Sequence, residues 1–514
     1  MWNKQIFDEL NSKINASRLG GGEKRIEKQH AAGKLTARER LDVLFDKGTF
    51  NEVGGLIESR IEDFGLDKKK VPGDGVVTGY GKIHGRTVFA SSEDFTVIGG
   101  TLGEYHSMKI RHVMDMAYET GAPFVSINDS GGARIEEGIC SLDGYSGIFY
   151  RNTRMSGIVP QISVILGPCA GGACYSPAIC DFVFMSEQTS RMFITGPQVV
   201  KAVTGEVVSA EELGSAKMHT TTSGAAHFLY KDDTECLLGV RKLLSYLPSN
   251  NTQKAKAVQS VYTKSCEDIQ EIVSDNQRKI YDVKQVIDRI TDDNSFFEVQ
   301  PEFAKNIVIG FCRMQGETVG IVANQPNHLG GSIDCDSSDK AARFIRFCDC
   351  FSIPVVSLVD VTGFLPGKNQ EHLGIIRHGA KMLYAYSEAT VPKITLITRK
   401  AYGGAYIAMN SKSMGADIVY AWPIAQMAVM GAEGAVDIIF RRQIQQAENT
   451  EQARSELINK YEEKFMNPYV AAKRGYIDDV IFPEFSRDKI LCALEILKDK
   501  KVSSPNKKHG NIPL

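Results

Sequence analysis

The sequence repeats a set of glycine, proline and aspartate positions at a nearly constant interval, and this repetition constrains the fold strongly. Seven matches occur in the same order, with an offset that drifts from 231 to 235: Gly99-Gly100 with Gly330-Gly331, Pro123 with Pro354, Asp129 with Asp360, Gly132 with Gly363, Pro160 with Pro392, Gly171-Gly172 with Gly403-Gly404, and Gly196 with Gly431. Small insertions in a duplicated domain leave such a drift, whereas chance pairing would not preserve the order. We therefore predict two homologous domains, residues 1–258 and 259–514.

Each half contains the same short turn, in which an apolar run leads into two adjacent glycines. Residues 162–166 precede Gly171-Gly172 in the first half, and the sequence after Arg399 contains Gly403-Gly404 in the second. Adjacent glycines expose the backbone, so that N–H groups can point at a ligand oxygen. Such donors stabilise the negative charge that develops on a thioester oxygen in enolate or acyl chemistry. A tight turn also uses paired glycines for structural reasons alone, but two matched copies favour a function.

Composition is that of a soluble globular protein, with 43% hydrophobic residues in a chain of 514. The 60 Lys and Arg nearly balance the 62 Asp and Glu, which gives no argument for nucleic-acid or membrane binding. The 11 cysteines include no C-x-x-C pair and no zinc-binding pattern, so we expect reduced thiols and no metal.

The first 18 residues include Asp8 and Glu9 and lack the apolar core of a signal peptide, so we expect a cytoplasmic protein. Residues 155–180 carry no charge, but glycines and prolines interrupt this run repeatedly. We expect short elements buried in a globular core rather than a membrane span.

Alternating apolar patterns predict an α/β fold. In the first half we expect strands at 87–90, 124–128, 162–166, 183–185 and 193–195, and helices at 103–120, 199–204, 211–217 and 234–247. A further helix is expected to begin at Thr36, where Glu39 completes a capping box. Residues 248–279 are weakly patterned and indicate the connection between the domains.

Nine motifs give the chain a resemblance to a known family: GKLTARERL at 33–41, VPGDGVVTG at 71–79, DSGGARI at 129–135, GPCAGGACYSP at 167–177, MFITGP at 192–197, IVANQP at 321–326, IRHGAKM at 376–382, RKAYGGAY at 399–406 and KKHGN at 507–511. The chain resembles the carboxyltransferase (β) subunit of biotin-dependent acyl-CoA carboxylases, in the group of propionyl-CoA carboxylase, methylmalonyl-CoA decarboxylase α and transcarboxylase. The resemblance implies two crotonase-type domains (β-β-α superhelices) in tandem, and a homohexamer of two stacked trimers.

The same resemblance implies a mechanism. Carboxybiotin on a separate carrier loses CO2 in the site, the biotin oxyanion removes the α-proton of a short acyl-CoA, and the enolate attacks CO2. Two oxyanions then need stabilisation, which accounts for two turns without a side-chain base. By resemblance, the N–H groups of Gly171 and Gly172 hold the thioester oxygen, and those of Gly404 and Ala405 hold the biotin carbonyl oxygen. The first domain is then the acyl-CoA side and the second the carboxybiotin side.

Side chains are assigned with alternatives. Ile407 follows the second turn and is a candidate for the acyl pocket, although an apolar residue there is equally a core residue. Arg134, together with Glu136, follows the turn at Gly131-Gly132 and is a candidate substrate-binding residue. The alternative for this pair is a surface ion pair on a helix.

Absent motifs indicate the partners. No Met-Lys-Met biotin-attachment pattern occurs, and Lys217 and Lys381, each followed by Met, lie in segments that we expect to be helical. No P-loop occurs either, so we expect a biotin carboxylase and a biotin carboxyl carrier as separate subunits. One alternative is the α subunit of a sodium-pumping methylmalonyl-CoA decarboxylase with a membrane β subunit. A more distant one is a crotonase-like hydratase or isomerase.

Overall fold

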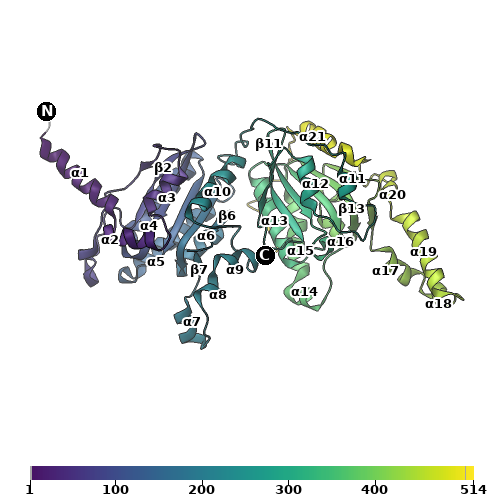
Figure 1. Ribbon diagram of the computed structural model, residues 1–514, viewed down its shortest axis with the longest axis horizontal. Helices are drawn as coiled ribbons and strands as arrows, with labels where there is room; N and C mark the ends of the chain where they lie inside the picture. The colour runs from purple at the N-terminus through teal and green to yellow at the C-terminus, as the bar shows by residue number, and fades with distance from the viewer. Residues whose placement is uncertain (1–2, 504) are drawn as a thin grey trace. The chain divides into compact units, whose positions relative to one another are not determined.

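The structure, a computed structural model, describes residues 3–503 and 505–514, which form two compact units, residues 1–255 and 256–514 (Figure 1). Each unit contains one eight-stranded mixed sheet. Within each sheet the first strands pair antiparallel and the later strands pair parallel. The expected α/β class with two similar domains is confirmed.

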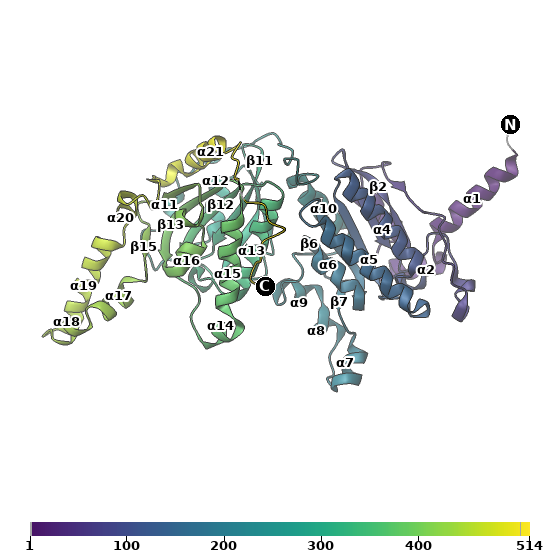
Figure 2. The same cartoon turned by 180° about the vertical axis from the view of Figure 1, so that it is seen from behind.

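Unit 1 orders its strands β1-β2-β3-β4-β5-β6-β8, with β7 paired to β5. The bounds are β1 Asn51–Glu52, β2 Val76–Ile83, β3 Arg86–Glu93, β4 Phe124–Ser130, β5 Gln161–Ala170, β6 Phe182–Ser186, β7 Arg191–Phe193 and β8 Phe228–Tyr230. Helices α4 (Glu104–Thr120) and α5 (Ile139–Met155) cover one face of this sheet, and α3 (Ala37–Leu44) and α10 (Asp233–Tyr246) cover the other (Figures 1 and 2).

Unit 2 repeats this topology strand for strand as β9-β10-β11-β12-β13-β14-β16, with β15 paired to β13. The bounds are β9 Phe297–Val299, β10 Ile307–Met314, β11 Glu317–Asn324, β12 Val355–Val361, β13 Lys393–Tyr402, β14 Ile418–Ala421, β15 Gln426–Ala428 and β16 Asp479–Val480. Helices α13 (Cys335–Cys350) and α15 (Ile375–Glu388) pack together like α4 and α5, and α12 (Val283–Ile290) packs with α21 (Ser486–Ile496). The repeat read from glycine and proline positions is thus a repeat of the whole topology.

Local signals in the sequence determine several boundaries. Thr36 caps α3 and forms the expected capping box with Glu39. Gly196 and Gly431, matched in the repeat, are the N-caps of α7 (Pro197–Thr204) and α17 (Ala432–Ile439). Lys217 and Lys381 lie in helices α9 (Ala216–Thr221) and α15.

In the first half, helices α2 and α5 were not predicted from the sequence. Helix α2 (Glu23–Ala31) has a largely polar surface, and α5 contains Gly144 and Gly147, which weaken a helical pattern. Gly144 is nevertheless required, because a Cβ there would lie 2.7 Å from the Cβ of Ser107 on α4. Tertiary packing against α4 therefore determines that residues 139–155 form a helix. Among the described residues, no helix has the length and apolarity of a membrane span.

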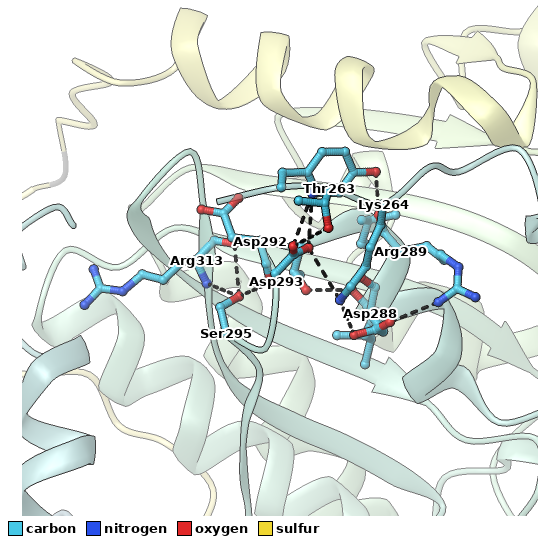
Figure 3. A network of polar contacts seen from close by, with 12 residues as sticks. Thr263, Lys264, Asp288, Arg289, Asp292, Asp293, Ser295 and Arg313 are labelled. Atoms are coloured by element: carbon cyan, nitrogen blue, oxygen red, sulfur yellow. Dashed lines mark hydrogen bonds and ion pairs between the residues drawn. The ribbon is translucent and has the colours of Figure 1, made fainter. Parts of the chain in front are cut away.

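Residues 248–279 were predicted to connect the domains, and polar contacts attach part of this segment to the rest of unit 2 (Figure 3). The Thr263 hydroxyl donates to the Asp293 carboxylate at 2.7 Å, and Lys264 pairs with Asp288 at 2.5 Å. The neighbouring Asp292 carboxylate accepts from the Gly316 backbone at 2.8 Å and pairs with the buried Arg487 of α21 at 2.6 Å. These contacts join Thr263 and Lys264 to α12 and to the loop after it. Asp292 in that loop is in turn paired with α21.

Replacing Arg487 by Met tests this connection. The change leaves the buried Asp292 without its cation and removes the donor to the Ile290 carbonyl, so unit 2 is expected to lose about 3–5 kcal/mol of unfolding free energy. Trp422 is fully buried and donates to Ser486, next to Arg487, so its fluorescence during urea denaturation reports on this region. Arg278→Met is the control, because the Arg278–Glu433 pair is exposed and is worth about 1 kcal/mol or less. Equal effects of the two changes would contradict the prediction.

Candidate active site

The first glycine turn joins β5 to a short 3-10 helix, Gly171–Cys174, and then to α6 (Tyr175–Ile179). Gly171 has φ of +64°, a conformation that other residues rarely adopt. The first N–H groups of a helix have no partner within it. Gly171 and Gly172 are both partly exposed, so the start of this short helix is accessible from outside the chain.

The second turn has the same construction. Strand β13 ends at Tyr402 and helix α16 (Gly403–Ala408) begins directly after it. Gly403 has φ of +59°, close to the value at Gly171. Gly404 is exposed and Ala405 is buried, so the open side of this turn lies over Gly404.

A bulge with a buried aspartate lies beside each turn. The parallel pairing of β4 with β5 shifts between Asn128 and Ser130, and that of β12 with β13 shifts between Val359 and Val361. The residue skipped in each ladder is an aspartate, Asp129 in unit 1 and Asp360 in unit 2, and each is at most 1% exposed. A buried carboxylate requires a cation or several donors.

In unit 1, side chains from outside the sheet supply the cations for Asp129. Lys34 contacts both carboxylate oxygens at 2.8 Å, and Arg40 of α3 contacts one of them at 3.0 Å. Arg40 also pairs with Asp233 at 2.8 Å and donates to the Leu166 carbonyl of β5 at 2.9 Å. This fully buried arginine therefore ties α3, α10, β4 and β5 together behind the first turn.

In unit 2, strand β13 supplies the cation itself. Arg399 lies on β13, four residues before Gly403, and pairs with Asp360 at 3.0 Å. The Lys400 backbone N–H donates to the same carboxylate at 3.1 Å. The position that matches Arg399 in unit 1 is Gly167, where a Cβ would lie 1.9 Å from an Asp129 oxygen. The two units thus neutralise the same carboxylate in different ways.

Burial and ion pairing have opposite effects on the pKa values of Arg40, Lys34 and Asp360. Burial would lower the pKa of Arg40, but Asp129 and Asp233 hold that pKa above its usual value. Burial lowers the pKa of Lys34, although Asp129 opposes the change. Burial also raises the pKa of Asp360, and Arg399 opposes that rise. Arg399 therefore favours the anionic form of Asp360 against the effect of burial.

The glycine pairs at 99–100 and 330–331 complete the two clusters. A Cβ at Gly100 would lie 2.2 Å from the Asp129 carbonyl, and one at Gly331 would lie 2.3 Å from the Asp360 carbonyl. The second glycine of each pair is therefore required for close backbone contact with the aspartate bulge. Matched glycines in the repeat thus converge on one place in each unit.

The structure corrects the interpretation of Arg134. Its side chain is fully buried and pairs with Asp74 at 2.8 Å and Glu137 at 2.6 Å, rather than forming a surface pair with Glu136. It also donates to the Thr101 carbonyl at 3.0 Å. A guanidinium with these partners holds the loop around it and has no exposed surface for substrate.

Ile407 follows the buried Ala405 by two residues and is itself 43% exposed. Within this chain it is not a core residue, so a position facing a ligand or another subunit fits its exposure.

Sequence reasoning assigned no role to Lys34, Arg40, Asp129, Asp360 or Arg399. The signal for Arg40 was its spacing, because it shares a helical face with the buried Ala37, Leu41 and Leu44. The signal for the aspartates was a carboxylate at the end of an apolar strand in both halves.

Each unit thus has one glycine turn at the start of a helix, where the first backbone N–H groups lack partners within the helix. The nearest strand-end carboxylates are held in buried ion pairs and are not free to act as acids or bases. Among the residues described, no three His, Cys, Asp or Glu side chains are grouped to hold a metal ion.

Comparison with known proteins gives consistent results. The family model described as "Carboxyl transferase domain" matches residues 28–512. The methylmalonyl-CoA decarboxylase subunit alpha of Propionigenium modestum is 56% identical over 99% of both chains, as is the carboxyltransferase subunit of propionyl-CoA carboxylase from Haloferax mediterranei. The crystal structure of transcarboxylase 12S, described as a hexamer with methylmalonyl-CoA and methylmalonic acid bound, superposes with a TM-score of 0.97 at 53% identity, covering 100% of this chain and 99% of that one.

Gly167→Ala tests the close packing behind the first turn. The new methyl group would overlap the Asp129 carboxylate and displace it from Lys34 and Arg40, so we expect a loss of at least about 3 kcal/mol of unfolding free energy. Gly434→Ala is the control, because its Cβ in α17 would meet only Met430 at 3.5 Å and should stabilise the helix by about 0.5–1 kcal/mol. Thermal and urea denaturation of both variants measure the effect. An unchanged midpoint for Gly167→Ala would show that the aspartate cluster is not tightly packed.

Proposed function

The chain belongs to the carboxyl transferase domain family, and from this premise we propose that it moves a carboxyl group between biotin on a separate carrier and a short acyl-CoA, propionyl-CoA or methylmalonyl-CoA. The observation that supports this most directly is the pair of matched glycine turns, one in each unit, at each of which a helix begins. A transfer that passes through two oxyanions needs two such sites.

In this proposal Gly171 and Gly172 donate to the thioester oxygen of acyl-CoA, and Gly404 and Ala405 donate to the biotin ureido oxygen. Biotin brings the carboxyl group and, once decarboxylated, accepts the α-proton. The protein orients both substrates and stabilises charge without a side-chain base. Unit 1 is then the acyl-CoA side, and unit 2 the carboxybiotin side.

We also propose that the chain works as a homohexamer. Transcarboxylase 12S, at 53% identity, is described as a hexamer. The matched helices α7 and α17 carry exposed apolar side chains, among them Val203 at 78% and Ile438 at 68% exposure. Side chains of this kind at matched positions suit burial between subunits.

The expected partners are a biotin carboxylase and a biotin carboxyl carrier subunit, in the cytoplasm. The alternative is the α subunit of a sodium-pumping methylmalonyl-CoA decarboxylase, since relatives of both kinds are 56% identical to this chain. The half-reaction is the same in either direction, so the neighbouring genes discriminate: a biotin carboxylase supports the first proposal and a membrane β subunit supports the second.

A crotonase-like hydratase or isomerase is less well supported. Such enzymes use free carboxylic side chains as acid and base. Here the strand-end carboxylates nearest the turns, Asp129 and Asp360, are buried in ion pairs. Biotin-dependent release of CO2 from methylmalonyl-CoA supports carboxyl transfer, whereas hydration of crotonyl-CoA would support the hydratase.

Proline substitutions test the donors themselves, because proline has no N–H. Gly172→Pro is expected to abolish α-proton exchange on propionyl-CoA but to spare slow decarboxylation of carboxybiotin. Gly404→Pro is expected to abolish carboxybiotin decarboxylation and, with it, transfer. Each lost donor should lower the affected rate by roughly 100–1,000-fold.

Alanine at the same positions is the matched control, because it keeps the N–H. Gly404→Ala should be well tolerated, because the new Cβ would lie 3.7 Å from the Phe364 ring. In Gly172→Ala the new Cβ would lie 3.1 Å from the Tyr145 ring, so this variant measures the steric effect alone. All variants are first checked for the wild-type oligomeric state by light scattering. Near-normal transfer by both folded proline variants would refute the assignment, and exchanged defects would reverse the roles of the two units.

Ile407→Asn tests the acyl pocket. If the acyl tail contacts Ile407, the ratio of acetyl-CoA to propionyl-CoA turnover should change by roughly 10–200-fold, the range for one methylene in an apolar pocket. Ile496→Asn is the control for loss of an exposed isoleucine in the same unit, at the end of α21. Equal loss of turnover with both substrates would show that Ile407 has no part in selectivity.

A further inference from the structure

A small cavity lies directly behind the first glycine turn, in the core of unit 1. It has a volume of about 20 Å³, and its lining includes Glu93, Asn128, Tyr145, Ala173 and Ser176. A cavity of this size holds one water molecule if two or more polar groups face it. The lining therefore meets both requirements for an internal water.

The Tyr145 hydroxyl in the lining and the His106 ring near Glu93 each have a buried polar atom without a hydrogen-bond partner in the described chain. The Tyr145 hydroxyl lies beside Ser130 without completing a hydrogen bond to it. His106 donates from Nδ1 to the Asp74 carbonyl at 3.0 Å, which leaves Nε2 as an unpartnered acceptor. Nε2 lies 3.7 Å from a Glu93 oxygen, beyond direct hydrogen bonding. Buried groups of this kind are normally satisfied by ordered water.

Glu93 is an uncharged carboxylic acid in this environment. Burial raises its pKa to about 8. The hydrogen bond from the Asp129 backbone N–H opposes this rise, the charge of Asp129 adds to it, and Arg40 of α3 opposes it. Burial lowers the pKa of His106, on α4, well below its usual value, so the imidazole supplies no positive charge. Tyr145, on α5, is neutral as well, because burial raises its pKa.

The second unit provides an independent argument for the neutral form. The position 231 residues after Glu93 is Asn324, at the end of β11. Glu93 accepts from the Asp129 N–H at 3.0 Å, and Asn324 accepts from the Asp360 N–H at 3.3 Å. An amide cannot ionise, yet it fills the same place beside the same strand bulge.

We propose that the cavity binds one water molecule between the Glu93 carboxylic acid and the Tyr145 hydroxyl, and that this buried set of hydrogen bonds positions the Gly171-Gly172 turn. The link to the turn is direct, because the Tyr145 ring lies 3.1 Å from where a Cβ on Gly172 would be. Glu93 acts on the same turn through the Asp129 backbone and the bulge next to β5. Glu93 and Tyr145 are positioning residues that touch no substrate, and this part rests on the proposed function of the turn.

Two measurements test the water site without any assay of activity. A crystal structure that resolves internal waters should show one water between Glu93 and Tyr145, and a dry cavity would overturn the proposal. Glu93→Gln mimics the neutral acid and removes its titration. A raised folded-state pKa means that the wild type loses stability as pH rises through 8, relative to this variant. Between pH 5.5 and 7.5 the two unfolding curves should differ in slope by about one proton, and identical slopes would show that Glu93 is not a neutral acid.

Tyr145→Phe tests the positioning role. The variant keeps the ring against Gly172 but removes the hydroxyl, so the kcat for α-proton exchange should fall roughly 3–10-fold, the effect of one buried hydrogen bond, with KM nearly unchanged. Tyr386→Phe is the matched control, because that fully buried tyrosine of unit 2 also makes one hydroxyl contact, to Ser357 at 2.8 Å. Equal losses in both variants would refute a specific positioning role. A wild-type chain that exchanges no α-proton in the presence of biotin would instead refute the proposed function and leave the water site to its own two tests.

Discussion

A buried carboxylate at a strand bulge supports each glycine turn. Asp129 and Asp360 interrupt the pairing of neighbouring parallel strands at the edge where the turns begin. An anion in the core is costly unless cations and donors surround it, so each aspartate draws several elements to one point. In unit 1 the cations are Lys34 and Arg40, and the absence of a side chain at Gly167 leaves room for the carboxylate. In unit 2 the cation is Arg399. The turns keep their open conformations because the chain immediately before them is fixed in this way.

The two units show how a duplicated fold diverges while the geometry of its site is retained. Strand order, bulge and turn are the same, but the groups behind the turn differ. Glu93 is replaced by Asn324 and Gly167 by Arg399, so unit 1 has an ionisable acid where unit 2 has an amide, and unit 2 places its cation on the strand itself. Backbone donors do not depend on side-chain identity, so the electrostatic surroundings can change while the N–H groups stay in place. This suits two turns that serve different substrates in one transfer reaction.

Backbone donors also explain why this family of folds needs few reactive side chains. In the proposed reaction, charge on a thioester oxygen and on a ureido oxygen is stabilised by fixed dipoles, which require no reorganisation when the reaction occurs. Holding the backbone of each turn in place requires several features of the fold. These are glycines with positive φ, a buried ion cluster, and close packing at Gly100 in unit 1 and Gly331 in unit 2. Most of the strongly constrained residues in the chain therefore support the site without touching a ligand.

The sequence by itself determined the duplication, the α/β class, the capping of α3 and the two glycine turns, because these depend on short-range backbone requirements that glycine, proline and capping residues reveal. The resemblance of its motifs added the family. Only the tertiary structure decided the partners of buried charges: Arg134 was expected near substrate and is enclosed by Asp74 and Glu137, and Arg40 reaches residues 89 and 193 positions away in the sequence. Helix α5, with its two glycines, was likewise decided by packing on α4. Such contacts depend on which distant segments the sheet brings together, and residue spacing carries no record of that.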